Sequence, residues 1–229
     1  MDKIKEEINW NSYLIPGTDV LINKLGAMTN EELSEKERKI VREKLILLYL
    51  RPIKGNFDIS HLLSVHKYIF DDIYPFAGKL RTCTLQKDIH MFCNPEDIEK
   101  QLTETLKQMN EEFDKDIYSK ESFAFKLAPF YNDLLYIHPF REGNGRTIRS
   151  FLRDFVVEKS KNKTCGEFDL DYTKIDKEKL LLGTAFRYIY PSYLEMEFIN
   201  GLVPVEKEKN SHNSKWLFLL IYLIKWYNN

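Results

Sequence analysis

The segment HPFREGNGRTIR, residues 138–149, combines residue types that can bind a phosphate and move a proton. Its Gly143-Asn144-Gly145 turn tolerates positive φ and leaves room for a ligand against the backbone. Consecutive backbone N–H groups in such a turn form a nest for phosphate oxygens. A helix that begins near Gly145 adds its partial positive charge to the same place. The turn therefore predicts an anion site. A tight turn between two helices without a ligand is the alternative that the glycines alone leave open.

Three arginines follow this turn, and they favour the anion site. Arg146, Arg149 and Arg153 lie at i, i+3 and i+7, so they share one face of the predicted helix. Cations near a helix N-terminus oppose its dipole, so helix stability does not explain the first two. The planar fork of arginine matches phosphate oxygens. Arg153 lies further along, and a salt bridge is the alternative role for it.

An acid and a histidine flank the same turn. A carboxylate at Glu142 would repel a phosphate unless a cation lies between them, and Mg²⁺ is commonly held by few protein ligands plus water. Electrostatic capping of the helix is the alternative role for Glu142. Neutral His138 can accept a proton from a hydroxyl that attacks phosphorus, and Phe140 is expected to wedge into the core. With no Walker A pattern and no H-E-x-x-H, the residues predict phosphoryl or nucleotidyl transfer to a hydroxyl with Mg²⁺.

The composition excludes several other classes. The chain has 229 residues, 43% of them apolar, and a net charge of -1, so neither nucleic acid nor an anionic membrane is an expected partner. The three cysteines form no C-x-x-C pair, and the N-terminus has no apolar signal region, so a cytoplasmic location is expected. The apolar stretch Trp216–Ile224 is about half the length of a membrane span. A docked terminal helix, a surface for a partner or membrane, and a span are the alternatives for it.

Helical spacing of apolar residues predicts an all-α fold that positions this loop. Asp58 is expected to cap a helix, Pro129 to kink or break one, and Leu80–Pro95 to form a short β-hairpin, the only region that favours strands. The expected helices cover residues 33–48, 59–73, 94–113, 122–137, 145–156, 175–187 and 190–201.

The quoted segment resembles the Fic motif H-P-F-x-[D/E]-G-N-G-R-x-x-R at every fixed position. Two further segments, SYLIPGTDVLINKLG at 12–26 and IFDDIYPFAGKLRT at 69–82, are similar to bacterial Fic proteins, so the resemblance extends from residue 12 to about residue 200. It implies the Fic fold, a helical bundle around a central motif-bearing helix pair with one hairpin flap. The implied organisation is an N-terminal helical segment at 1–57, a core domain at 58–202 and a tail at 203–229.

The resemblance also implies an activity, namely transfer of AMP from ATP to a tyrosine, threonine or serine of a target protein. His138 would be the general base, Glu142 would hold Mg²⁺, and Gly143, Asn144 and Gly145 would line the phosphate site. Arg146 and Arg149 would hold the β- and γ-phosphates. The flap would hold an extended segment of the target by strand addition; its residues are Lys87, Asp88, Ile89, His90, Met91 and Phe92. The kinase branch of the family has alanine and lysine where Gly143 and Gly145 stand, which favours nucleotidyl transfer here.

Many Fic proteins carry an inhibitory helix with the pattern [ST]-x-x-x-E-[GN]. The only glutamate followed by glycine or asparagine is Glu142, and the segment TNEELSEKER at 29–38 does not fit. Inhibition within the chain is therefore not supported, and we expect either a separate small antitoxin protein or no such control. Two alternatives to a toxin-type adenylyltransferase stay open. One is a nucleotide-binding interaction module with little catalysis, and the other is transfer from a different nucleotide.

Overall fold

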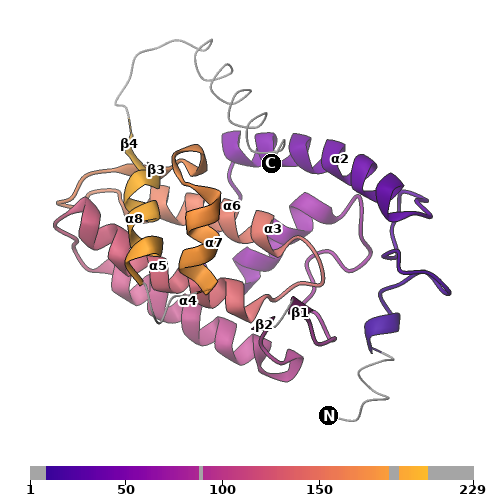
Figure 1. The fold of residues 1–229 in the computed structure, drawn as a ribbon. Helices are drawn as coiled ribbons and strands as arrows, with labels where there is room; N and C mark the ends of the chain where they lie inside the picture. Colours follow the sequence, from indigo (N-terminus) through magenta and orange to yellow (C-terminus); the bar gives the residue numbers. More distant parts are fainter. Residues whose placement is uncertain (1–8, 88–89, 186–190, 206–229) are drawn as a thin grey trace. The chain divides into compact units, whose positions relative to one another are not determined.

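The computed structural model describes residues 9–87, 90–185 and 191–205, and these are mostly helical (Figure 1). The chain divides into two compact units. Unit 1 comprises Met1–Leu106 with Leu134–Ser150, and unit 2 comprises Lys107–Asp133 with Phe151–Asn229. No helix in the described ranges is long and apolar enough to cross a bilayer. The apolar stretch Trp216–Ile224 lies outside the described residues.

Unit 1 contains two capped helices, α2 (Asn30–Leu50) and α3 (Ile59–Phe70), which contact each other (Figure 1). The Asp58 side chain accepts a hydrogen bond from the His61 N–H, which confirms it as the N-cap of α3. Thr29 caps α2 in the same way, through the Glu32 N–H. Both helices bury apolar residues at helical spacing, as predicted; these include Leu33, Val41 and Leu48 of α2, with Leu62, Ile69 and Phe70 of α3.

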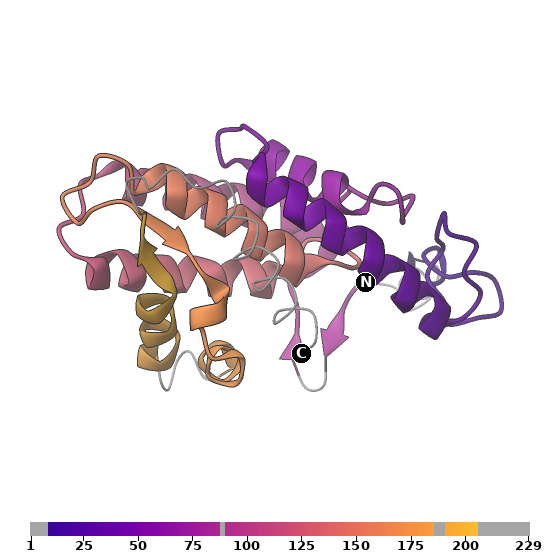
Figure 2. The same ribbon diagram turned by 90° about the horizontal axis from the view of Figure 1, so that it is seen from above.

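The predicted hairpin is also in unit 1. Strands β1 (Gln86–Lys87) and β2 (His90–Met91) pair antiparallel, with Gln86 opposite Met91 (Figure 2). The residues that join the two strands, Asp88 and Ile89, lie outside the described residues.

Three further helices follow, and each has residues in both units. They are α4 (Ile98–Asp114), preceded by the 3₁₀ turn η1 (Pro95–Asp97), then α5 (Lys120–Ile137) and α6 (Asn144–Lys159). α5 continues through Pro129, so of the two alternatives expected there, a kink or a break, the break does not occur. The apolar residues at helical spacing in α4 and α6 are buried, as their spacing predicts; they are Ile98, Leu102, Leu106, Met109 and Phe113 of α4, and Ile148, Phe151, Leu152, Phe155 and Val156 of α6.

Unit 2 also contains α7 (Lys177–Ala185) and α8 (Pro191–Gly201), which lie side by side (Figure 1). A Cβ at Gly183 would come within 2.8 Å of the Leu194 nitrogen, so the absence of a side chain lets the two helices approach. The turn η2 (Tyr172–Lys174) precedes them.

A second antiparallel pair in unit 2, β3 (Phe168–Leu170) with β4 (Leu202–Pro204), corrects the prediction that strands form in one region only. Leu170 pairs with Leu202, far along the chain. Strands of three residues are too short to show a period of two, and their partners are chosen by tertiary packing.

Arg153 forms a salt bridge in unit 2, which confirms the alternative role predicted for it. Its Nε and Nη2 donate to the two carboxylate oxygens of Asp169 at 2.7 and 2.9 Å, and its Nη1 donates to Asp154 Oδ1 at 3.2 Å. Asp154 is 7% exposed, and its Oδ2 has no hydrogen-bond partner among the described residues. Burial raises the pKa of the Asp154 carboxyl to about 6, against the opposing effect of Arg153.

We expect Asp154 to make the stability of the protein depend on pH. Because its folded pKa lies above the unfolded value of ~3.9, its contribution is fully present below pH ~4 and is lost as pH rises through 6, by ~2–3 kcal/mol. Asp154→Asn keeps an oxygen acceptor for Arg153 but does not ionise, so it should remove this slope. Urea unfolding of the wild type and the variant between pH 4 and 7 measures how the free energy of unfolding depends on pH. Equal pH dependence of wild type and variant would contradict the assignment.

Candidate active site

The motif loop connects α5 to α6 within unit 1, and its two ends have unusual backbone angles. His138 has φ 47° and Gly143 has φ 81°, both in the left-handed region. Phe140 is fully buried and stacks on His66 with ring centroids 3.8 Å apart, which confirms its predicted role as a wedge. Asn144 closes the loop: its Oδ1 accepts from the Phe140 N–H at 2.8 Å, and its Nδ2 donates to the Phe140 carbonyl at 2.7 Å.

The three residues of the predicted nest therefore have different structural roles. The Asn144 side chain is used by the loop, so its backbone N–H is the group that an anion site would use. Gly143 needs its positive φ, and a Cβ there would come within 2.3 Å of the Phe70 ring. Gly145 does not have positive φ, but a Cβ there would lie 3.0 Å from Arg149 Nη1. The second glycine and the second motif arginine are thus adjacent.

His66 of α3 holds the backbone just before the nest. The Gly78 N–H donates to its Nδ1 at 2.8 Å, so its Nε2 carries the proton and donates to the Glu142 carbonyl at 3.0 Å. Burial lowers the pKa of His66 to about 4, with a smaller opposing effect from the Glu142 hydrogen bond. His66 is therefore neutral at pH 7. His66 lies among the buried apolar residues of α3, and no local pattern in the sequence indicates this contact.

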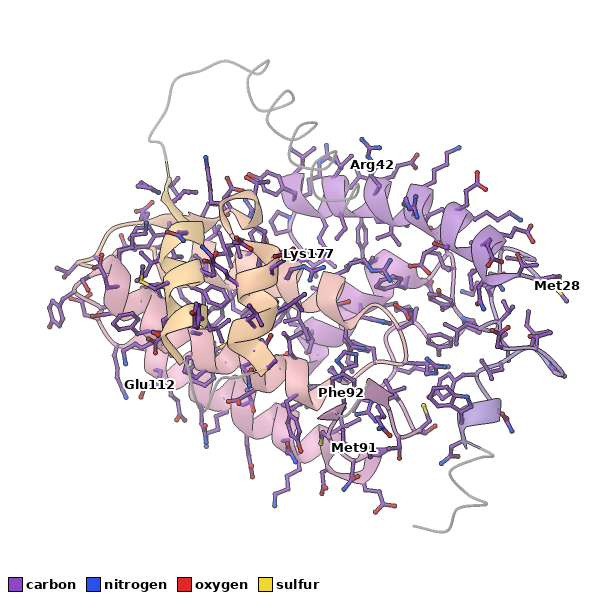
Figure 3. All side chains as sticks on the ribbon, in the orientation of Figure 1. Met28, Arg42, Met91, Phe92, Glu112 and Lys177 are labelled. Carbon is purple, nitrogen blue, oxygen red and sulfur yellow. The ribbon has the colours of Figure 1, made fainter. Side chains whose placement is uncertain are left out.

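The predicted base, His138, is fixed in one tautomer. Its Nδ1 lies 3.1 Å from the Leu135 carbonyl oxygen. Because a carbonyl oxygen can only accept a hydrogen bond, Nδ1 carries the proton of the neutral ring and Nε2 is the basic nitrogen. The imidazole stacks on Phe92 with ring centroids 3.9 Å apart and 19° between the planes. Figure 3 shows Phe92 beside Met91, which is 52% exposed. The flap thus contributes one aromatic ring to the histidine and one exposed side chain.

Arg146 is held between two carboxylates. Its Nη1 donates to Glu37 of α2, and its Nη2 donates to Glu142 Oε1 at 3.0 Å. The Tyr74 hydroxyl donates to the other oxygen of Glu37. Burial, followed by the charge of Glu37, raises the pKa of Tyr74, so this hydroxyl stays protonated. The contact between Glu37 and Arg146 joins residues 109 positions apart.

Glu142 is engaged locally as well. Its Oε1 also accepts from the Gly143 N–H at 2.8 Å, as expected for the capping role that the sequence left open. The side chain is 40% exposed, so it is still accessible to a cation. Within the described residues no group of three or more His, Cys, Asp or Glu side chains could hold a metal ion.

Glu37 is the site residue that sequence reasoning missed most clearly. It belongs to TNEELSEKER, the segment set aside because it does not fit the inhibitory pattern, yet it contacts the first motif arginine. The available signal was a carboxylate on the apolar stripe of α2, where it is 8% exposed. Carboxylates are rarely so buried without a charged or hydrogen-bonding partner.

Comparison with known proteins agrees with this fold and motif. The model of the Fic/DOC family matches residues 56–156. A probable protein adenylyltransferase of Sinorhizobium fredii, y4lH, is 32% identical over 171 residues, which cover 72% of this chain and 82% of that protein. The protein adenylyltransferase VbhT of Bartonella schoenbuchensis is 28% identical over 80% of this chain, which spans 37% of the length of VbhT.

Solved structures show the same fold. BepC of Bartonella tribocorum, crystallised with bound AMPPNP, has a TM-score of 0.74 and 22% identity, and the match covers 86% of this chain and 98% of that one. The helical fold and the family predicted from the sequence are therefore confirmed: the chain belongs to the Fic/DOC family.

Replacing Gly143 with alanine should destabilise the protein by about 2–5 kcal/mol, because it adds backbone strain at positive φ to a clash with Phe70. Gly17→Ala is a matched control, since Gly17 has φ 77° and no atom of the described part of the chain lies within 4 Å of its Cβ position. The control should lose only the part of the stability that comes from backbone strain at positive φ. Chemical denaturation measures both variants, and equal losses would show that the clash with Phe70 is not felt.

Glu37→Gln should lower stability by ~1–3 kcal/mol, because it removes the charge that pairs with partly buried Arg146 while leaving Glu142 in place. Glu32→Gln on the same helix is the control. Glu32 pairs with Lys36 at the surface, so the loss of this ion pair should change the free energy of unfolding little. Thermal or urea unfolding compares the two. A larger loss in the control would refute the importance assigned to Glu37.

Proposed function

We propose that this chain transfers AMP from ATP to the hydroxyl of a tyrosine, threonine or serine in a target protein and releases pyrophosphate. The observation that carries the proposal is the tautomer of His138, which presents Nε2 as a base on the loop that ends in the Gly143–Gly145 nest. Adenylyltransferase relatives support it. An interaction module that only bound a nucleotide would have no use for a base fixed in this way.

The proposed chemistry uses each side chain in one role. The acceptor hydroxyl oxygen attacks the α-phosphorus while its proton passes to His138 Nε2. The bond between the α-phosphorus and the oxygen bridging to the β-phosphate breaks, and pyrophosphate leaves. Backbone N–H groups at the start of α6 and the guanidinium of Arg149 stabilise the charge on the phosphates. Arg146 contributes next to them, with its charge partly balanced by Glu37 and Glu142.

Glu142 is the residue that would hold Mg²⁺. A single accessible carboxylate fits this ion, which is usually bound by one or two carboxylates together with substrate phosphates and water. When bound, the ion would neutralise phosphate charge. It would compete with Gly143 N–H and Arg146 Nη2 for the same carboxylate.

The flap is proposed to hold the target. A two-stranded ladder leaves strand edges to which an extended segment can add. Met91 and Phe92 lie at the end of β2, with Phe92 against the His138 ring, so a segment paired there would run beside the base. We also keep as proposals a small antitoxin partner and a cytoplasmic location, the latter supported by three free cysteines.

The test follows the label of ATP. Incubation of the protein and Mg²⁺ with a bacterial lysate should place label on a protein band from α-³²P-ATP but not from γ-³²P-ATP. His138→Ala should reduce transfer by ~10²–10⁴-fold, the usual cost of losing a positioned base, while calorimetry still shows ATP binding. Arg149→Ala should weaken both, by ~1.5–3 kcal/mol in binding for a lost charge-assisted contact.

Other outcomes would assign a different function. Label from the γ position would indicate a kinase, and tight ATP binding without transfer would indicate a nucleotide-binding module. Competition by unlabelled UTP stronger than by ATP would change the donor and keep the mechanism. Full activity of His138→Ala would remove the proposed base.

A further inference from the structure

We infer that Arg81 is a positioning residue for this reaction, which fixes the catalytic loop and the base of the flap as one hydrogen-bonded unit. The inference rests on the proposed function, since it concerns how His138 and the flap are brought into register. Arg81 lies between α3 and the hairpin in sequence and is 2% exposed.

The contacts of Arg81 are unusual for a buried cation, because each of its partners in the described part of the chain is a backbone carbonyl. Its Nε donates to His138 at 2.7 Å, and its own backbone N–H donates to Pro139 at 2.8 Å. The other guanidinium nitrogens donate to the carbonyls of Cys83 at 2.6 Å, Cys93 at 2.6 Å and Ile137 at 3.2 Å.

The end of α5 explains why a cation is stable here. The helix ends at Ile137, so its last carbonyls have no donor within the helix and carry the negative end of its dipole. The Arg81 guanidinium donates hydrogen bonds to the backbone carbonyls of Ile137 and of the following residue, His138. Burial lowers the pKa of Arg81, but the guanidinium stays charged because arginine does not lose its proton in proteins.

The same guanidinium closes the base of the flap from both sides. Cys83 comes shortly before β1, and Cys93 comes shortly after β2. The Cys93 N–H donates to the Tyr136 carbonyl at 3.1 Å. Four consecutive carbonyls, from residue 136 to residue 139, therefore accept hydrogen bonds from two residues at the base of the flap.

The hydrogen bonds of Arg81 constrain the backbone of His138, the proposed base. His138 has a left-handed backbone, which costs a residue with a side chain ~1–3 kcal/mol and persists only where the surroundings enforce it. Arg81 holds the carbonyl of that residue, and the Leu135 carbonyl holds its ring. Without Arg81 the loop can relax and move the imidazole away from the acceptor hydroxyl. A displacement of ~1 Å can cost ~10²-fold in rate.

Arg81→Lys and Arg81→Gln test the inference, with Arg153→Lys as the control. Lysine keeps the charge, but its ammonium has only three N–H groups for four carbonyls, and glutamine loses the charge. Arg153 is a second partly buried, multiply bonded arginine, but its partners are Asp154 and Asp169 in unit 2. The measurements are transfer from α-³²P-ATP to lysate proteins at saturating ATP, the Kd of Mg-ATP by calorimetry, and the unfolding midpoint.

We expect both Arg81 variants to lose ~10²-fold in transfer while the Kd of Mg-ATP stays within about twofold, because the nucleotide contacts lie elsewhere on the loop. The acidic limb of the pH–rate profile should also shift, because the environment of His138 changes. Arg153→Lys should lose stability but keep its transfer rate and pH profile. Wild-type transfer by Arg81→Lys, or an equal loss in Arg153→Lys, would overturn the inference.

Failure of the proposed function can be recognised separately. If the wild-type protein transfers no AMP, the function is wrong, and the role of Arg81 is then decided by NMR on the same proteins. Faster hydrogen exchange of the Cys93 amide and a changed titration of the His138 ring, in Arg81→Lys but not in Arg153→Lys, would support the coupling. Unchanged exchange and titration would refute it.

Discussion

The backbone between Tyr136 and Asn144 turns sharply between two helices inside the protein, and its polar groups cannot be left without partners. Its polar groups are paired with side chains and with the backbone N–H groups of Arg81 and Cys93. The Arg81 guanidinium donates to the carbonyls at the end of α5, and the His66 ring donates to the Glu142 carbonyl. The Asn144 side chain pairs with both the N–H and the carbonyl of Phe140. The positions of His138, the proposed base, and of the proposed phosphate nest at Gly143–Gly145 follow from these hydrogen bonds. The shape of the loop is therefore set by hydrogen bonds within the protein, as electrostatic preorganisation of the proposed site requires.

The charges at the start of α6 are also compensated by neighbouring side chains. Arginines at a helix N-terminus oppose the dipole, and the first of them is compensated by Glu37 and Glu142. Arg149 lies against Gly145, where the lack of a side chain leaves space for its guanidinium. The two motif arginines thus differ in their surroundings, although the sequence presents them as equivalent. Arg153, on the same helix, has the salt bridge that the sequence offered as its alternative role.

Features with local causes could be predicted from the sequence. Asp58 caps α3 because its side chain reaches an N–H three residues ahead, and the apolar spacing of α4 and α6 matches their buried faces. The pairing of β3 with β4 could not be predicted, because three-residue strands carry no periodic signal and Leu170 and Leu202 meet only in the folded chain. The roles of Glu37 and His66 were hidden for a related reason. Both occupy apolar stripes, and their partners, 109 and 76 positions away, are brought to them by folding.

The sequence by itself determined the motif, its order of histidine, acid, glycines and arginines, the helical class and the family, because these depend on residue identity and short-range spacing. The tertiary structure decided which nitrogen of His138 is basic, which glycine needs positive φ and which needs space, and which buried side chains hold the loop. These properties arise from hydrogen bonds between residues far apart in the chain. Such bonds exist only after apolar burial has brought the helices together, so no local pattern encodes them.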